Sequence, residues 1–153
     1  MPLLFPALWK AASRGQMDEV LQLLVHGADI GERGGLWDST PLHEASWEGH
    51  EGVVRKLLKY TADVSSADSS GGTPLHNACC KGHLGVARLL LENGADVSAG
   101  NNDAITPVQC AICQGYTAVA VLLLEYGAEL PAERKTPMTE LEAAALLGYH
   151  GSV

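Results

Sequence analysis

The sequence predicts an all-α solenoid built from stacked repeats, and three observations support this prediction. The string Thr-Pro-Leu-His stands at 40–43 and again at 73–76, and weaker copies begin at Thr106 and Thr139, each 33 residues after the one before. Each full copy contains two helical patterns, and a polar connector rich in Gly, Ser and Asn follows them. A unit of this kind cannot cover its own apolar face, so neighbouring units must stack around a shared core.

The first helix of each unit is predicted by its start and stop signals. In the second unit, Thr40 can cap the helix with its hydroxyl, and Pro41 occupies the first helical position, where a missing N–H costs nothing. Leu42 and Ala45 begin the apolar face, and Gly49 ends the helix. The same signals recur after Thr73, so the pattern belongs to the repeat.

A second helix is predicted by an apolar stripe at the i, i+1, i+4, i+5 spacing of one helical face. In the second unit this stripe comprises Val53, Val54, Leu57 and Leu58. The strings that close the second helices begin at Gly27, Thr61, Gly94 and Gly127. Since Gly adopts the left-handed conformation of such a cap most easily, Thr61 is expected to strain its cap slightly.

These features resemble the ankyrin repeat, which carries a Thr-Pro-Leu-His-x-Ala signature, a Gly-His between its helices and a Gly-Ala-Asp close. The segments 40–45 and 73–78 match the signature fully, and the resemblance runs from about Pro6 to Val153. It implies an ankyrin-repeat solenoid of about four full repeats plus a truncated fifth, with short β-hairpin fingers between units. The predicted units of this single domain are 1–37, 38–70, 71–103, 104–136 and a partial 137–153.

Three departures from the family pattern affect the interpretation. The connector 30–39 has one extra residue and carries Trp37, so its finger is longer. In the fourth unit Gln109 replaces the signature His, which puts the hydrogen bonds of that His to the adjoining turn in question. The last predicted helix, 141–147, would expose apolar surface, although a terminal repeat normally has a polar outer face. We therefore expect the chain to be a fragment or truncated product of a longer array.

Composition argues against several classes of function. The net charge of −8, with only 10 Lys and Arg scattered along 153 residues, argues against nucleic-acid binding, because that depends on clustered positive charge. No apolar run approaches the roughly 20 residues that a membrane-spanning helix needs. The four cysteines fall within helical patterns and are expected to be free thiols. A cytoplasmic or nuclear protein is expected, monomeric unless the apolar C-terminal end pairs.

No enzyme, cofactor or metal is predicted. The chain lacks a Gly-x-Ser-x-Gly elbow, a phosphate-binding Gly loop and a His-Glu-x-x-His helix. Cys110 and Cys113 could share a helix face, but a structural zinc site needs four converging ligands. Four of the six histidines belong to the repeat itself, in the signature or the Gly-His turn.

The resemblance also implies where a protein partner would bind, because partners of ankyrin arrays usually lie against the fingers and the concave face of the first helices. A mostly apolar column precedes each helix-ending Gly, and Trp47 would be its anchor, since Trp is enriched at binding hot spots. The alternative is that Trp37 and Trp47 only shield the solenoid. The predicted partner-binding residues are Leu36, Trp37, Ser39, Trp47, Glu48, Ser70, Cys80, Lys81, Asn102, Asp103, Ile105, Cys113, Gln114 and Leu146.

Two classes of function fit this pattern. The first is a non-enzymatic protein–protein interaction module, acting as a scaffold, adaptor or inhibitor through its fingers and concave groove. The second is a substrate-recruiting segment of a larger enzyme or ubiquitin-ligase assembly.

Overall fold

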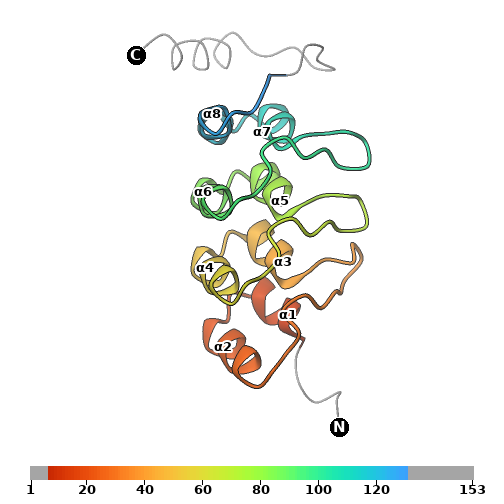
Figure 1. Cartoon of the computed structure of the whole chain (residues 1–153), viewed down its shortest axis with the longest axis vertical. Helices are drawn as coiled ribbons and strands as arrows, with labels where there is room; N and C mark the ends of the chain where they lie inside the picture. Colours follow the sequence, from red (N-terminus) through yellow and green to blue (C-terminus); the bar gives the residue numbers. More distant parts are fainter. Residues whose placement is uncertain (1–6, 131–153) are drawn as a thin grey trace.

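The computed structural model describes residues 7–130, which form eight α-helices arranged as a two-layered column (Figure 1). One layer contains α1 (Leu8–Ser13), α3 (Pro41–Glu48), α5 (Pro74–Lys81) and α7 (Pro107–Gln114). The other layer contains α2 (Met17–Val25), α4 (Glu51–Lys59), α6 (Leu84–Glu92) and α8 (Thr117–Glu125). The predicted all-α solenoid is confirmed. The predicted fifth unit, with Leu146, lies outside the described residues.

The helix starts and stops follow the signals in the sequence. At α3, the Thr40 hydroxyl accepts a hydrogen bond from the His43 backbone N–H at 3.3 Å, and Gly49 ends the helix with φ of 80°. At α7, Gln109 Oε1 accepts the backbone N–H of Thr106 at 2.8 Å. Gln109 therefore keeps the capping contact that the signature His makes. Its contact with the next connector, which the sequence put in question, falls outside the described residues.

Buried histidines tie each first helix to the connector that follows it. His43 Nε2 lies 2.8 Å from the carbonyl oxygen of Gly72, and His76 Nε2 lies 2.8 Å from that of Ile105. Because a carbonyl oxygen only accepts, Nε2 carries the proton and Nδ1 is left to accept from the capping Thr. Burial lowers the pKa of both histidines, which favours this neutral form.

A second set of contacts stacks one unit on the next at the helix-ending glycines. A Cβ on Gly49 would come within 2.6 Å of the His83 ring, and one on Gly82 within 2.7 Å of the Tyr116 ring. His83 Nε2 also donates to the carbonyl oxygen of Trp47 at 2.9 Å. The glycines are therefore required for left-handed caps and for close packing between units.

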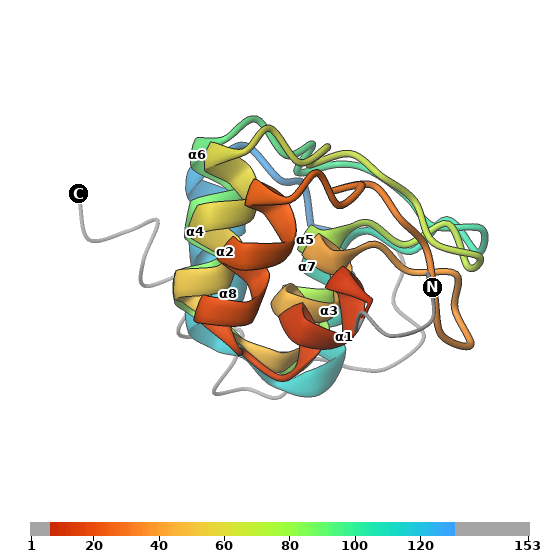
Figure 2. The same cartoon turned by 90° about the horizontal axis from the view of Figure 1, so that it is seen from below.

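The fingers are hairpin-shaped turns with little strand pairing. Within residues 7–130, β-pairing outside helices is limited to an isolated antiparallel bridge between Gly34 and Ser39. In the next finger, Asp68 N donates to Gly72 O at 2.9 Å. The Asp68 side chain accepts the N–H groups of Ser70 and Gly72, so these are not paired across the hairpin. Adjacent fingers are joined by backbone hydrogen bonds, and they lie beside the first-layer helices (Figure 2).

The second-helix caps and the core agree with the prediction. Thr61 has a φ of 67°, in the left-handed region that Gly27, Gly94 and Gly127 occupy in the other units. The core passes from unit to unit through fully buried side chains at equivalent positions of the first-layer helices, Leu8, Leu42, Leu75 and Val108. Among the described helices, none combines the length and the apolar character that crossing a bilayer requires.

Candidate functional site

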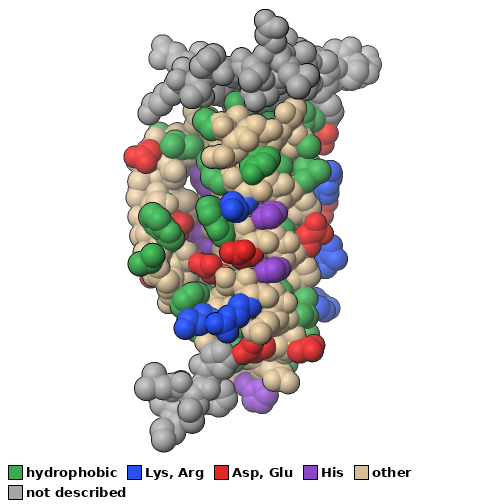
Figure 3. Space-filling view, turned by 180° about the vertical axis from the view of Figure 1, so that it is seen from behind, with side chains coloured by type: hydrophobic (Ala, Val, Ile, Leu, Met, Phe, Trp, Pro, Cys, Tyr) green, Lys and Arg blue, Asp and Glu red, His purple; other side chains and the backbone are tan. Residues whose placement is uncertain are grey.

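A groove separates the fingers from the first-layer helices of the second, third and fourth units. It encloses a cavity of about 440 Å³. Figure 3 shows the hollow between the finger loops and the helical column, with hydrophobic side chains on both sides of it. The helices contribute Glu44, Trp47, His76, Asn77, Cys80 and Cys110 to its lining. The fingers and the residues that follow them contribute Trp37, Ser39, Asp68, Ser70, Gly72 and Asn101.

The groove gathers some of the predicted partner-binding residues and leaves others outside. The members that line it are Trp37, Ser39, Trp47, Ser70 and Cys80. The described members outside its lining are Leu36, Glu48, Lys81, Asn102, Asp103, Ile105, Cys113 and Gln114. A binding role for any of these residues stays a prediction.

One column of lining residues was missed in the sequence. Glu44, Asn77 and Cys110 are 33 residues apart and lie three positions before Trp47, Cys80 and Cys113. Residues three apart share a helix face, so the repeat register could have identified this column. The sequence analysis considered the fingers and the positions beside the helix-ending Gly, so it found Trp47 and Cys80 but not the more polar column one helical turn earlier.

Two exposed indole rings flank the groove from different elements. Trp37, in the finger, is 62% exposed, and Trp47, on α3, is 41% exposed. The Lys81 ammonium lies 5.1 Å from the centre of the Trp47 ring, within the range of a cation–π interaction. The aromatic faces of the site can therefore interact with cations as well as with apolar groups.

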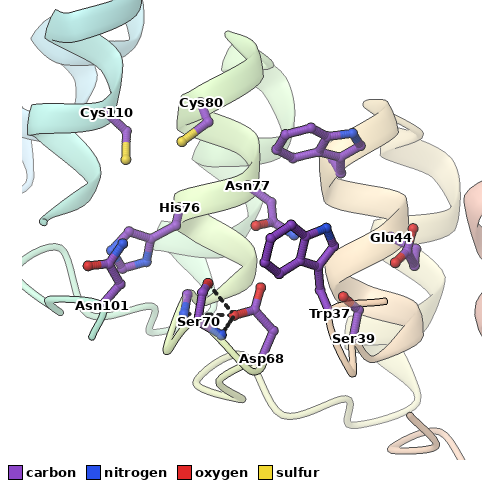
Figure 4. A pocket seen from close by; sticks show the side chains of 12 residues that line it. Trp37, Ser39, Glu44, Asp68, Ser70, His76, Asn77, Cys80, Asn101 and Cys110 are labelled. Atoms are coloured by element: carbon purple, nitrogen blue, oxygen red, sulfur yellow. Dashed lines mark hydrogen bonds between the residues drawn. The ribbon is translucent and has the colours of Figure 1, made fainter. Parts of the chain in front are cut away.

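Two carboxylates face the same space. Burial raises the pKa of Glu44, the Glu48 carboxylate adds to this effect, and the neighbouring Ser39 hydroxyl opposes it. Asp68 Oδ1 accepts hydrogen bonds from Ser70 N at 2.9 Å, Ser70 Oγ at 2.7 Å and Gly72 N at 3.0 Å (Figure 4). These bonds fix the Asp68 carboxylate in the finger, next to the groove.

The cysteines of the described chain are free thiols, as predicted. The thiols of Cys80 and Cys110 lie on neighbouring helices and both line the groove (Figure 4). A hydrogen bond with the Cys110 side chain lowers the pKa of the Cys80 thiol, whereas burial raises the pKa of the Cys79 thiol. Residues 7–130 contain no cluster of three or more His, Cys, Asp or Glu side chains that could hold a metal ion.

Comparison with known proteins agrees with the repeat architecture. A family model of ankyrin repeats in three copies matches residues 6–68 and 62–134. Human palmitoyltransferase ZDHHC17 is 41% identical over 61 residues, which are 40% of this chain and 10% of that protein. Zebrafish putative palmitoyltransferase ZDHHC13 is 43% identical over 61 residues, again 40% of this chain and 10% of that protein.

A third relative comes from a different class of protein. Mouse ankyrin repeat and SOCS box protein 6 is 41% identical over 68 residues, which are 44% of this chain and 16% of that protein. The chain thus spans only a small part of these relatives. Since the family model covers most of the sequence, the chain belongs to the ankyrin-repeat family, whose repeats form protein–protein interaction modules.

Proposed function

We propose that this protein is a non-catalytic interaction module that holds an extended segment of a partner protein in the groove between its fingers and first-layer helices. The observation that carries the proposal is a pair of exposed tryptophans, Trp37 from a finger and Trp47 from α3, that both line a cavity of about 440 Å³. Exposed indoles beside a cavity supply the large contact area on which binding hot spots depend.

The test is partner capture with single alanine variants. Trp47→Ala removes the aromatic anchor on α3, and we expect it to reduce capture of a cross-linked, mass-spectrometrically identified partner at least about tenfold. Tyr126→Ala is the matched control, because Tyr126 is also 41% exposed but follows α8 in the other layer. Circular dichroism should show the same helix content for both variants. Equal capture by both would remove the groove from the proposal.

A second candidate function is favoured by the relatives. Two of them are named as palmitoyltransferases and one as a SOCS box protein, so a similar stretch of repeats is present within longer proteins of these two kinds. In that case the module would recruit substrates. An experiment can distinguish substrate recruitment from a free-standing adaptor. The protein is depleted, and S-acylation and ubiquitylation of its captured partners are measured. A change restored by the wild type but not by Trp47→Ala would favour recruitment, and unchanged modification would favour a free-standing adaptor.

A further inference from the structure

The groove carries more negative charge than its fold requires, and Asp68 shows this most clearly. Asn101 occupies the same position one unit later, and its Oδ1 accepts the backbone N–H groups of Asp103 at 2.9 Å and Ile105 at 3.0 Å. Asp68 Oδ1 accepts the equivalent N–H groups of Ser70 and Gly72. An uncharged amide oxygen therefore supports this turn as well as a carboxylate does, and the charge of Asp68 has no necessary structural role.

The second oxygen of this carboxylate is available to a ligand. All hydrogen bonds of the Asp68 side chain within the described chain use Oδ1. Asn77 has a similar spare acceptor, since its Nδ2 donates to the carbonyl oxygen of His43 at 3.1 Å and its Oδ1 has no partner among the described residues. Figure 4 shows Asp68, Asn77 and Trp37 around the same space. Together with Glu44, they offer acceptors beside an aromatic face.

The groove lining contains no Lys or Arg to neutralise Glu44 and Asp68. His76 is neutral there, because its Nε2 donates to Ile105 O and its Nδ1 accepts from Thr73. Two nearby cations already have partners: Arg33 donates to the carbonyl oxygens of Asp38 and Ala67, and the Lys81 ammonium lies over the ring of Trp47, beside the groove. The lining is therefore complementary to a cation that a ligand would bring.

We infer that the groove binds an arginine side chain of the partner's extended segment, with the guanidinium donating to Asp68 Oδ2 and stacking on Trp37. This inference rests on the proposed function. A guanidinium presents five N–H donors in a plane and stacks on aromatic rings, which suits several acceptors beside an indole. An ammonium is a more strongly hydrated point charge with fewer donors, and a trimethylated lysine has no N–H donor, so neither satisfies the carboxylate and amide oxygens as fully.

The test uses the whole chain and four pools of decapeptides, random in uncharged residues except at one central position. That position holds arginine, its neutral isostere citrulline, lysine or trimethyl-lysine. Binding is followed by NMR through the indole N–H signals of Trp37 and Trp47. We expect the arginine pool to shift both signals and to bind at least about tenfold more tightly than the citrulline pool.

Two charge-matched variants test the role of Asp68. Asp68→Asn keeps the acceptor for the turn, as Asn101 shows, and should reduce affinity for the arginine pool about tenfold. Asp96→Asn removes the same charge from a connector turn outside the groove lining, where Oδ1 accepts the Ser98 N–H, and should leave affinity unchanged. Equal effects of the two variants would overturn a specific contact with Asp68.

The peptide pools also separate this inference from the proposed function. Equal binding of the arginine and citrulline pools at both tryptophans would overturn the arginine assignment and leave the groove as a peptide site. Tighter binding of the lysine or trimethyl-lysine pool would likewise replace guanidinium recognition with ammonium recognition. If no pool shifts either indole signal, both the arginine assignment and the groove as a binding site are overturned.

Discussion

Residues at the same repeat position make different sets of hydrogen bonds in different units. His76 and Gln109 both accept the backbone N–H of a capping Thr, at 3.1 and 2.8 Å. His76 also donates across to the next connector through Nε2, at 2.8 Å from Ile105 O. The signature His is therefore both a helix cap and a link between units, and this dual role requires the neutral ring.

The neutral state of His76 predicts a loss of stability in acid. Its folded pKa lies below the ordinary value of 6.5, mainly because the ring is buried, and the hydrogen bond to Ile105 and the charge of Asp68 oppose this only in part. The unfolded chain therefore binds more protons below pH 6.5. The stability that this group contributes is present above pH 6.5 and lost as the pH falls through the folded pKa, with a slope of at most about 1.4 kcal/mol per pH unit.

The variant His76→Gln isolates this effect, because Gln109 shows that Gln caps the same turn. We expect urea unfolding at pH 7.5 to show a loss of about 1 kcal/mol from the missing bond to Ile105. Between pH 6.5 and pH 5, the free energy of unfolding should fall less steeply in the variant than in the wild type. His43 keeps part of the slope in both proteins. Parallel pH profiles would show that His76 titrates normally in the folded state.

At the scale of the helices, stability depends on the glycines at which they end. Gly49 and Gly94 both have positive φ, 80° and 91°, but their surroundings differ. A Cβ on Gly49 would meet the His83 ring at 2.6 Å, whereas a Cβ on Gly94 would meet nothing within 4 Å. The two glycines thus separate the cost of a left-handed backbone from the cost of displacing a neighbouring unit.

This pair predicts a measurable difference between two alanine variants. Gly94→Ala should cost about 1–2 kcal/mol, because an L-residue is strained in the left-handed region. Gly49→Ala should cost about 1 kcal/mol more, since the His83 ring must move and its bond to the Trp47 carbonyl is weakened. Urea unfolding midpoints, compared at unchanged slope, give both values. The packing argument fails if the two variants are equally destabilised.

At the scale of the whole molecule, stability follows from a linear stack. Each first-layer helix packs on the next, from α1 to α3, α5 and α7, and the second layer follows the same order. Leu8 in α1 and Leu75 in α5 are both fully buried, but Leu75 has neighbouring units on both sides. In such an array, a change is felt first by adjacent units.

Hydrogen exchange should reveal this difference. Leu8→Ala and Leu75→Ala each remove a buried side chain and should cost about 2–5 kcal/mol locally. We expect Leu8→Ala to speed exchange in α1 and α2 while α5 to α8 keep their protection. Leu75→Ala should speed exchange on both sides of α5. Uniform acceleration throughout the chain by Leu8→Ala would indicate a single cooperative unit instead of a linear array.

The sequence by itself determined the repeat, the helix caps and the left-handed Thr61, because these depend on contacts within one unit. Short sequence patterns such as Thr-Pro-Leu-His, and single glycines, predict these contacts directly. The tertiary structure alone decided which finger residues face which helical residues across the groove. The displacement and rotation of each unit against the next determine which residues meet in the groove. They bring Asp68, Asn77 and Trp37 together and place Cys80 near Cys110. That displacement results from packing between units, which no single repeat encodes.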